Sequence, residues 1–140
     1  MTVQFRRATV DDAAALAPMN ALLIRDEGHR NPMTVAQLQE RMANWLKGEY
    51  QAVVFEAEAQ PIGYAPYRFE PEHVYLRQLF VLLEHRRRGI ARAALGWLRR
   101  NAWSEHLRVR IDVLVANRSG IEFWRSVGFS EYCLTMESDL

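Results

Sequence analysis

The sequence is short of the features that mark secreted, membrane-spanning and zinc-binding proteins. Cys133 is the single cysteine in 140 residues, which excludes a disulfide within the chain and a cysteine-based zinc site. No run of about 18 apolar residues occurs, so no membrane-spanning helix is predicted. The start of the chain lacks the apolar core of a signal peptide. We therefore expect a cytoplasmic protein.

A net charge of only +1 conceals an uneven distribution of charge along the chain. Arg77 to Arg100 holds seven arginines against one acidic residue, Glu84. Asp11 to Glu40 holds five acidic residues against two arginines. The first segment suits an anionic ligand and the second a cationic one, although ordinary scatter of surface charge also accounts for the second.

The length fits a single domain, residues 1–140, without repeats or linkers. Periodicity and capping signals predict the order β-α-α-β-β-β-α-β-α-β, an α/β arrangement. Pro66 cannot donate to a sheet ladder, so we expect a bulge or irregular pairing there. The predicted strands are 3–7, 52–57, 62–69, 73–82, 109–115 and 129–136. The first two predicted helices run from a Thr9 capping box to about Ile24 and from a Thr34 capping box to about Gly48. The other two run over 90–103 and from Ser119 to Gly128.

A basic loop between a predicted strand and a predicted helix is the most informative segment. Apolar residues up to Leu83 precede Arg86-Arg87-Arg88-Gly89, and a helix with one apolar face follows from Ile90. A helix N-terminus has unpaired N–H groups and a partial positive charge, so consecutive arginines there favour a bound phosphate. The alternative is a solvated basic turn that binds nothing.

Two motifs resemble those of a known family. Arg86-x-x-Gly89-x-Ala91 after an apolar strand resembles the acyl-CoA loop of the GNAT superfamily of N-acetyltransferases. Asn117 followed by a helix that ends in Gly128-Phe129 resembles the family's second signature. The motifs stand in the family's order, one helix and one strand apart.

The resemblance implies a fold and a cosubstrate. The fold would be a mixed, mostly antiparallel central sheet flanked by helices, with splayed strands that hold CoA. Backbone amides of the loop would cradle the CoA pyrophosphate, and a glycine without a Cβ would permit its close approach. The residues implied to bind acetyl-CoA are Phe80, Val81, Arg86, Arg87, Arg88, Gly89, Ile90, Ala91, Arg92, Asn117 and Trp124.

Several of these residues also have a structural explanation. Phe80 and Val81 suit core packing, Arg92 suits an exposed helix surface, and Asn117 suits a helix cap. No metal is implied, and no metal-ligand spacing links the histidines His29, His73, His85 and His106.

The sequence departs from the family at the positions that transfer protons. Many members carry a tyrosine where Trp124 stands, and an indole offers no acid for the leaving thiolate. Some members carry a glutamate base where Tyr75 stands, and a phenol with a pKa of about 10 is a poor base but a passable acid. We predict catalytic roles for Tyr75 and for Glu27, whose carboxylate, in a predicted loop with Asp26 and His29, would attract a protonated amine. His73, on the same strand as Tyr75, is either a proton shuttle or simply exposed.

The resemblance therefore predicts an N-acetyltransferase that moves an acetyl group from acetyl-CoA to a primary amine by direct attack in a ternary complex, without an acyl-enzyme. The alternative is a catalytically weak or inactive CoA-binding sensor or interaction module of the same fold. A nucleic-acid surface on the arginine-rich segment is disfavoured by the near-neutral net charge. The acceptor, a small-molecule or peptide amine, does not follow from the fold. No membrane partner is expected, and a homodimer stays open.

Overall fold

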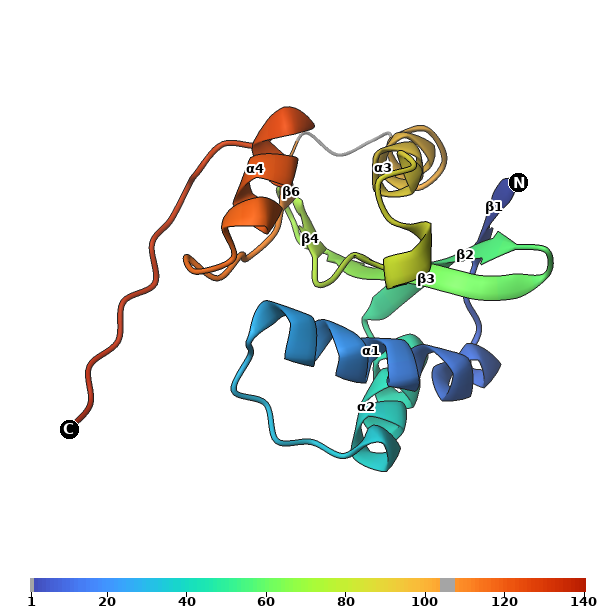
Figure 1. Cartoon of the computed structure of the whole chain (residues 1–140), viewed down its shortest axis with the longest axis horizontal. Coiled ribbons are helices and arrows are strands. Elements are labelled where there is room, and N and C mark those ends of the chain that lie inside the picture. Colours follow the sequence, from blue (N-terminus) through green and yellow to red (C-terminus); the bar gives the residue numbers. More distant parts are fainter. Residues whose placement is uncertain (1, 104–107) are drawn as a thin grey trace.

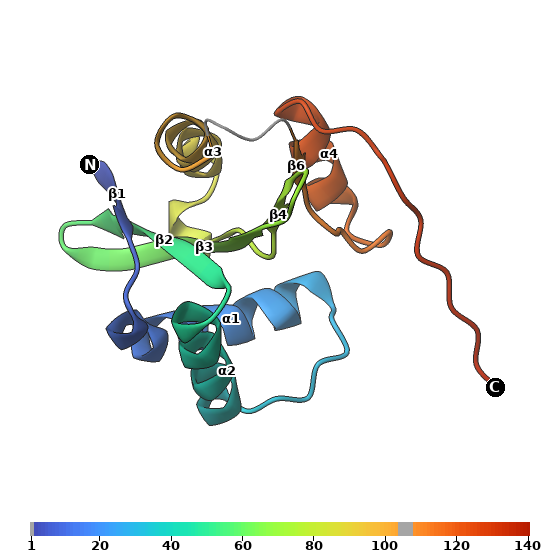
Figure 2. The same ribbon diagram turned by 180° about the vertical axis from the view of Figure 1, so that it is seen from behind.

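The computed structural model describes residues 2–103 and 108–140 (Figures 1 and 2). Within these residues, six strands form one sheet in the order β1-β2-β3-β4-β6, and β5 pairs farther along β3. All pairs are antiparallel except β4 with β6, so the predicted fold class is confirmed. The strands are β1 (Val3–Arg7), β2 (Tyr50–Ala57), β3 (Gln60–Phe69), β4 (Val74–Leu76), β5 (Phe80–Val81) and β6 (Val109–Arg110). The α-helices are α1 (Ala13–Glu27), α2 (Val35–Lys47), α3 (Ile90–Asn101) and α4 (Arg118–Ser126). Two short 3₁₀ helices are η1 (Val10–Asp12) and η2 (Leu83–His85).

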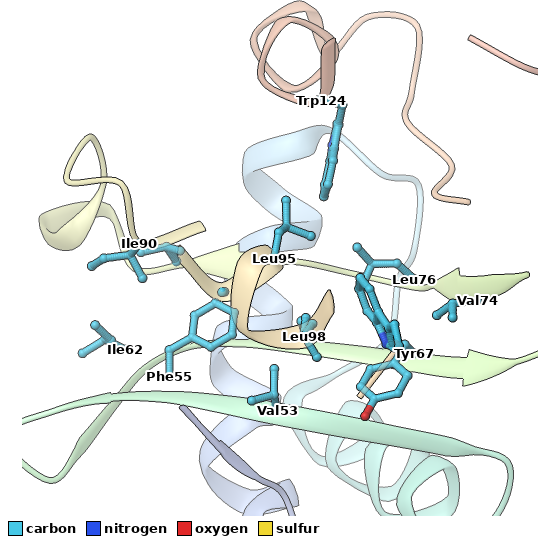
Figure 3. Close-up of a cluster of buried hydrophobic side chains, with 14 of the residues drawn as sticks. Val53, Phe55, Ile62, Tyr67, Val74, Leu76, Ile90, Leu95, Leu98 and Trp124 are labelled. Carbon is cyan, nitrogen blue, oxygen red and sulfur yellow. The ribbon is translucent and has the colours of Figure 1, made fainter. Parts of the chain in front are cut away.

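Helices cover both faces of the sheet, with α1 and α2 on one side and α3 on the other (Figures 1 and 2). Neighbouring residues of a strand point to opposite faces, so β2 contributes to two cores. Val53 and Phe55 pack in the core that α3 covers, beside Leu98 (Figure 3). Val54 packs on the other face with the core of α1 and α2. Burying a side chain of this size contributes about 2 kcal/mol to the free energy of folding. Packing on both faces therefore stabilises β2.

Both predicted capping boxes are present. At α2, the Gln37 amide donates to Thr34 Oγ1 over 3.2 Å, and the Thr34 amide donates to Gln37 Oε1 over 2.9 Å. Before α1, the Thr9 amide donates to Asp12 Oδ2 over 2.7 Å. These bonds satisfy amides that a helix start leaves unpaired. The first box opens the short helix η1, and α1 follows it directly.

Helix α1 continues past its predicted end near Ile24 and stops at Glu27. Gly28 follows with a left-handed φ of 72°, and its amide bonds to carbonyls of the last turn, as in a glycine-terminated helix. The prediction that Asp26 and Glu27 lie in a loop was therefore wrong. Both lie on the last turn of a helix, because the glycine that ends the helix comes after them.

The predicted strand from His73 to Leu82 is divided into β4 and β5, which pair with different parts of β3. The break lies opposite Pro66, whose carbonyl accepts a hydrogen bond from the Arg77 amide over 2.9 Å. Proline has no N–H to continue the ladder. The predicted irregular pairing occurs on the side of β3 that faces β4 and β5. On the other side, Pro66 stays in register with Ala52, and the register shift lies at Phe55 and Glu56 instead.

Two strand predictions near the C-terminus were wrong. The predicted strand 109–115 pairs only at β6, parallel to Val74 and Tyr75. The chain of β5 turns to β3, and no strand of the described residues pairs with residues 111–115. The predicted strand 129–136 is an extended segment that is exposed after Phe129 (Figure 1). Its alternating apolar residues satisfy the local pattern of a strand, but no strand of the described residues lies beside it to pair with.

The two remaining helices differ slightly from their predicted bounds. Helix α3 ends at Asn101 rather than Trp103. Helix α4 begins one residue earlier than predicted, and Asn117 rather than Ser119 caps it. In the part of the chain that the structure describes, no helix combines the length and apolar character needed to cross a membrane.

Candidate active site

Two adjoining cavities open where the chain of β5 parts from β6. The larger, about 580 Å³, is lined by β5, the loop before α3 and the start of α4. The smaller, about 310 Å³, is lined by the end of α1, the Tyr75 to Leu79 segment and residues after β6. Leu23, Glu27 and Leu79 line both cavities. Two molecules can therefore be held side by side, with their ends meeting at these residues.

The loop before α3 leaves its backbone amides unpaired beside the larger cavity. No group of the described residues accepts a hydrogen bond from the amides of residues 87–92. The loop is tight, since Arg87 and Gly89 both have left-handed backbones, with φ of 64° and 76°. A Cβ at Gly89 would meet no atom within 4 Å, so the backbone conformation selects glycine there. Such a row of amides at a helix N-terminus fits a phosphate group.

Arg86 binds back to the protein and braces the loop. Its Nε donates to the Val81 carbonyl over 2.7 Å, and its Nη2 donates to Asp26 Oδ2 over 2.9 Å. Its guanidinium also lies over the Phe80 ring at 5.2 Å. The side chain lines the larger cavity but is already partnered. Arg86 therefore positions the loop, whose amides stay open.

The other predicted loop residues divide between the cavity and the surface. Arg87, Ile90, Ala91 and Arg92 line the larger cavity together with Gly89. Arg88 is exposed and lines neither cavity. Three successive side chains of a tight turn point in different directions, so they do not all face one cavity.

Strand β5 brings Phe80 and Val81 to the wall of the larger cavity. Both side chains are buried, and the backbone supplies the polar groups. The Leu82 amide donates to the Ile62 carbonyl of β3 over 2.8 Å. Backbone groups alternate in direction along an antiparallel strand, so the Val81 amide faces away from β3. The Val81 carbonyl, which accepts from Arg86, lies on that same open side.

Asn117 combines the two roles that the sequence left open. Its Oδ1 accepts a hydrogen bond from the Gly120 amide over 3.0 Å and so caps α4. It also lines the larger cavity, beside Ser119 and Gly120. Trp124 lines the smaller cavity instead and is buried between the rings of Phe123 and Phe129.

Tyr75 lines the smaller cavity and is hydrogen-bonded to a carboxylate. Its hydroxyl donates to Asp112 Oδ2 over 2.9 Å. Burial, followed by this hydrogen bond, raises the pKa of Tyr75 to about 12. The phenol therefore keeps its proton at neutral pH and acts as a donor.

Glu27 is the acidic side chain that reaches both cavities. Its Oε1 lies 2.9 Å from His29 Nε2, and His29 lines the smaller cavity. Asp26 lines the larger cavity, paired with Arg86. His73 lines neither cavity and precedes β4.

The sequence did not single out Asp112, Arg41 or Arg77, which all line the smaller cavity. Asp112 alternates with the apolar residues Ile111 and Val113, a signal that places it on the polar side of the segment. Only the parallel pairing of β4 with β6 brings that side to Tyr75. No sequence pattern indicated a role for Arg41, because it lies on α2, far in the sequence from the other residues that line this cavity after β4 and β6.

The described residues contain no group of three or more His, Cys, Asp or Glu side chains that could hold a metal ion. His106, one of the four histidines considered, lies outside the described residues.

Residues 17–129, which include the basic loop and Asn117, match the acetyltransferase (GNAT) family. The chain belongs to this family. The family predicted from the two motifs, and with it the class of acetyltransferases, is thereby confirmed. A search of the curated proteins finds none that matches the sequence.

Solved acetyltransferase structures share the whole fold. A possible acetyltransferase from Clostridium difficile 630 has a TM-score of 0.83 at 16% identity, over 100% of this chain and 98% of the other. The aminoglycoside N-acetyltransferase AAC(6')-Iy in complex with CoA has a TM-score of 0.80 at 15% identity, over 99% and 95%. A ribosomal-protein-alanine N-acetyltransferase from Brucella melitensis biovar Abortus 2308 has a TM-score of 0.80 at 15% identity, over 99% and 100%. At these identities the similarity shows the fold of this GNAT chain.

Proposed function

We propose that the protein transfers the acetyl group of acetyl-CoA to a primary amine by direct attack within a ternary complex. One observation carries this proposal: the two cavities meet at Leu23, Glu27 and Leu79. A donor in the larger cavity and an acceptor in the smaller one would place their reacting ends together. Holding two reactants in this way replaces a bimolecular encounter by a step within one complex.

The larger cavity suits the donor. The open amides of residues 87–92 would bind the pyrophosphate of CoA, and the positive end of α3 adds to this attraction. The outward-facing Val81 amide would donate to the thioester carbonyl, whose oxygen gains negative charge as the amine attacks. The CoA that is bound to the aminoglycoside N-acetyltransferase of the same fold supports this assignment.

The reaction forms a bond between the amine nitrogen and the acetyl carbon and breaks the bond between that carbon and sulfur. The attacking amine must lose protons, and the departing thiolate gains one. Glu27, at the junction of the cavities, would accept the amine proton directly or through a water molecule. Tyr75 keeps its proton because its pKa is raised, and its hydroxyl would exchange its bond to Asp112 for one to the acceptor or the leaving group. Cys133 is exposed in the C-terminal segment, which agrees with direct attack rather than an acyl-enzyme.

A CoA-binding module without catalysis is the second candidate. It is favoured by Trp124, which is buried where many family members carry the acidic tyrosine. Such a module would bind acetyl-CoA and acetylate no amine.

The first experiment is a calorimetric titration with acetyl-CoA, beside ATP and a duplex oligonucleotide at the same salt concentration. We expect saturable binding of acetyl-CoA alone. An amine panel, followed by release of the CoA thiol, then separates the two candidates. The Glu27→Gln variant should lower kcat by about 100-fold, and the exposed Glu49→Gln variant serves as the control. Absence of acetyl-CoA binding would overturn the proposal, and equal rates for both variants would remove Glu27 from the mechanism.

A further inference from the structure

The smaller cavity contains two arginines that lack a carboxylate partner among the described residues. Arg41, from α2, donates from Nη2 to Asn20 Oδ1 over 3.1 Å. Arg77, which follows β4, donates from Nη1 to the Tyr50 hydroxyl over 3.4 Å. Both therefore bind neutral groups and keep their full charge beside the cavity. Arg86, at the larger cavity, is by contrast paired with Asp26.

The two guanidinium groups also share one aromatic neighbour. Both lie over the ring of Trp45, at 4.4 Å for Arg41 and 5.1 Å for Arg77. Burial, followed by the repulsion of Arg77, lowers the pKa of Arg41. Arg41 Nε is buried and has no hydrogen-bond partner among the described residues. An anion bound by both arginines would offset this repulsion.

The cavity also has carboxylates, and their placement gives it a direction. Glu27 lies where the smaller cavity meets the larger one, whereas Arg41 and Arg77 line the smaller cavity alone. Asp112 lies beside Tyr75 in the smaller cavity. A ligand with its amine at the junction would therefore extend an anionic group toward the arginines.

We propose that the acceptor is a small amine that carries a carboxylate, in the simplest case an amino acid. Arg41 and Arg77 bind its carboxylate, and its amine lies beside Glu27. This inference rests on the acetyl transfer proposed above. Guanidinium groups bind carboxylates through paired hydrogen bonds, so the two arginines select acids over amides. They also repel polycationic amines of the aminoglycoside type.

Matched acceptors test the proposal directly. Glycine and the L-amino acids that have a primary amine are compared with their primary amides, which keep the side chain and the amino group but lack the carboxylate. We expect kcat/KM to be higher for the acid in at least one pair by about 10-fold or more. In the Arg77→Gln variant, KM for the preferred acid should rise by about 10-fold or more, while its amide changes little. Arg41→Gln should act in the same direction. The exposed Arg100→Gln variant, outside both cavities, is the matched control.

Binding measurements separate this inference from the acetyl transfer itself. The protein saturated with CoA is titrated calorimetrically with the same acids and amides. Acids that bind only when Arg41 and Arg77 are intact support the arginine site, even if no acetyl group is transferred. Amides that bind or react as well as the acids would overturn the inference, as would equal losses for acid and amide in Arg77→Gln. Unchanged binding of acetyl-CoA to both arginine variants would exclude general misfolding.

Discussion

Gly63 lies where β3 pairs with β5. Its replacement by alanine tests how rigidly this pairing is packed. A Cβ at this position would lie 2.4 Å from the Phe80 carbonyl oxygen and 2.5 Å from Cδ2 of Phe55. Both distances are well inside van der Waals contact. The first contact is to backbone and the second to a fully buried ring, so neither group can swing away. Strand β5 would have to move from β3.

We expect the Gly63→Ala variant to lose about 3 kcal/mol of unfolding free energy, the upper end for one added methyl group in a packed core. For a domain of this size, the melting temperature should fall by about 10 °C. Because the displaced strand carries the Val81 amide, affinity for acetyl-CoA should also fall. Urea denaturation, thermal unfolding and calorimetric titration measure the three effects.

Gly96→Ala is the matched control, because a Cβ there would meet only the mobile end of the Arg100 side chain, at 3.1 Å. Alanine within a helix such as α3 should add about 0.5–1 kcal/mol. A Gly63→Ala variant as stable as the wild type, or one with unchanged acetyl-CoA affinity despite lower stability, would refute the reasoning.

Two further predictions concern the loop and the phenol. Gly89→Ala should lower the unfolding free energy measured by urea denaturation by about 1 kcal/mol, because alanine disfavours the left-handed φ of 76°. A bulky residue such as valine should in addition abolish acetyl-CoA binding in a folded protein. Retained affinity would argue against the phosphate site. The raised pKa of Tyr75 predicts that stability depends on pH. Below a pH of about 10, this group should not affect the unfolding free energy. Above it, the unfolding free energy should decline as the pH rises towards the folded pKa of about 12. Tyr75→Phe should reduce that decline, and an identical pH profile would contradict the assigned environment.

The capping boxes and the position of the basic loop, which depend on neighbours in the sequence, were predicted correctly. The capping boxes at Thr9 and Thr34 join residues three positions apart, so the chain needs no tertiary contact to reveal them. The basic loop is equally local, because a strand, a tight turn and a helix start follow one another directly. This is why the sequence could place residues 86–89 in a loop that leads into α3.

The errors in the strands arose where a pattern needed a distant partner. The segment 129–136 alternates like a strand, but alternation specifies only the local preference and not the strand beside it. The predicted strand 73–82 was divided because Pro66, on another strand, interrupts the ladder. Asp26 and Glu27 were placed in a loop because helix bounds read from a sequence are uncertain by a few residues.

The sequence by itself determined the order of the elements from β1 to β3, the basic loop that leads into α3, and the family, because each of these depends on short-range patterns. Only the tertiary structure decided which side chains share the smaller cavity. Arg41 comes from α2, Arg77 from the break after β4, and Asp112 from the segment after β6. Side chains so far apart in the chain meet because β4 pairs in parallel with β6 while α1 and α2 pack on one face of the sheet. The cavity and the grouping of its charges are properties of that packing.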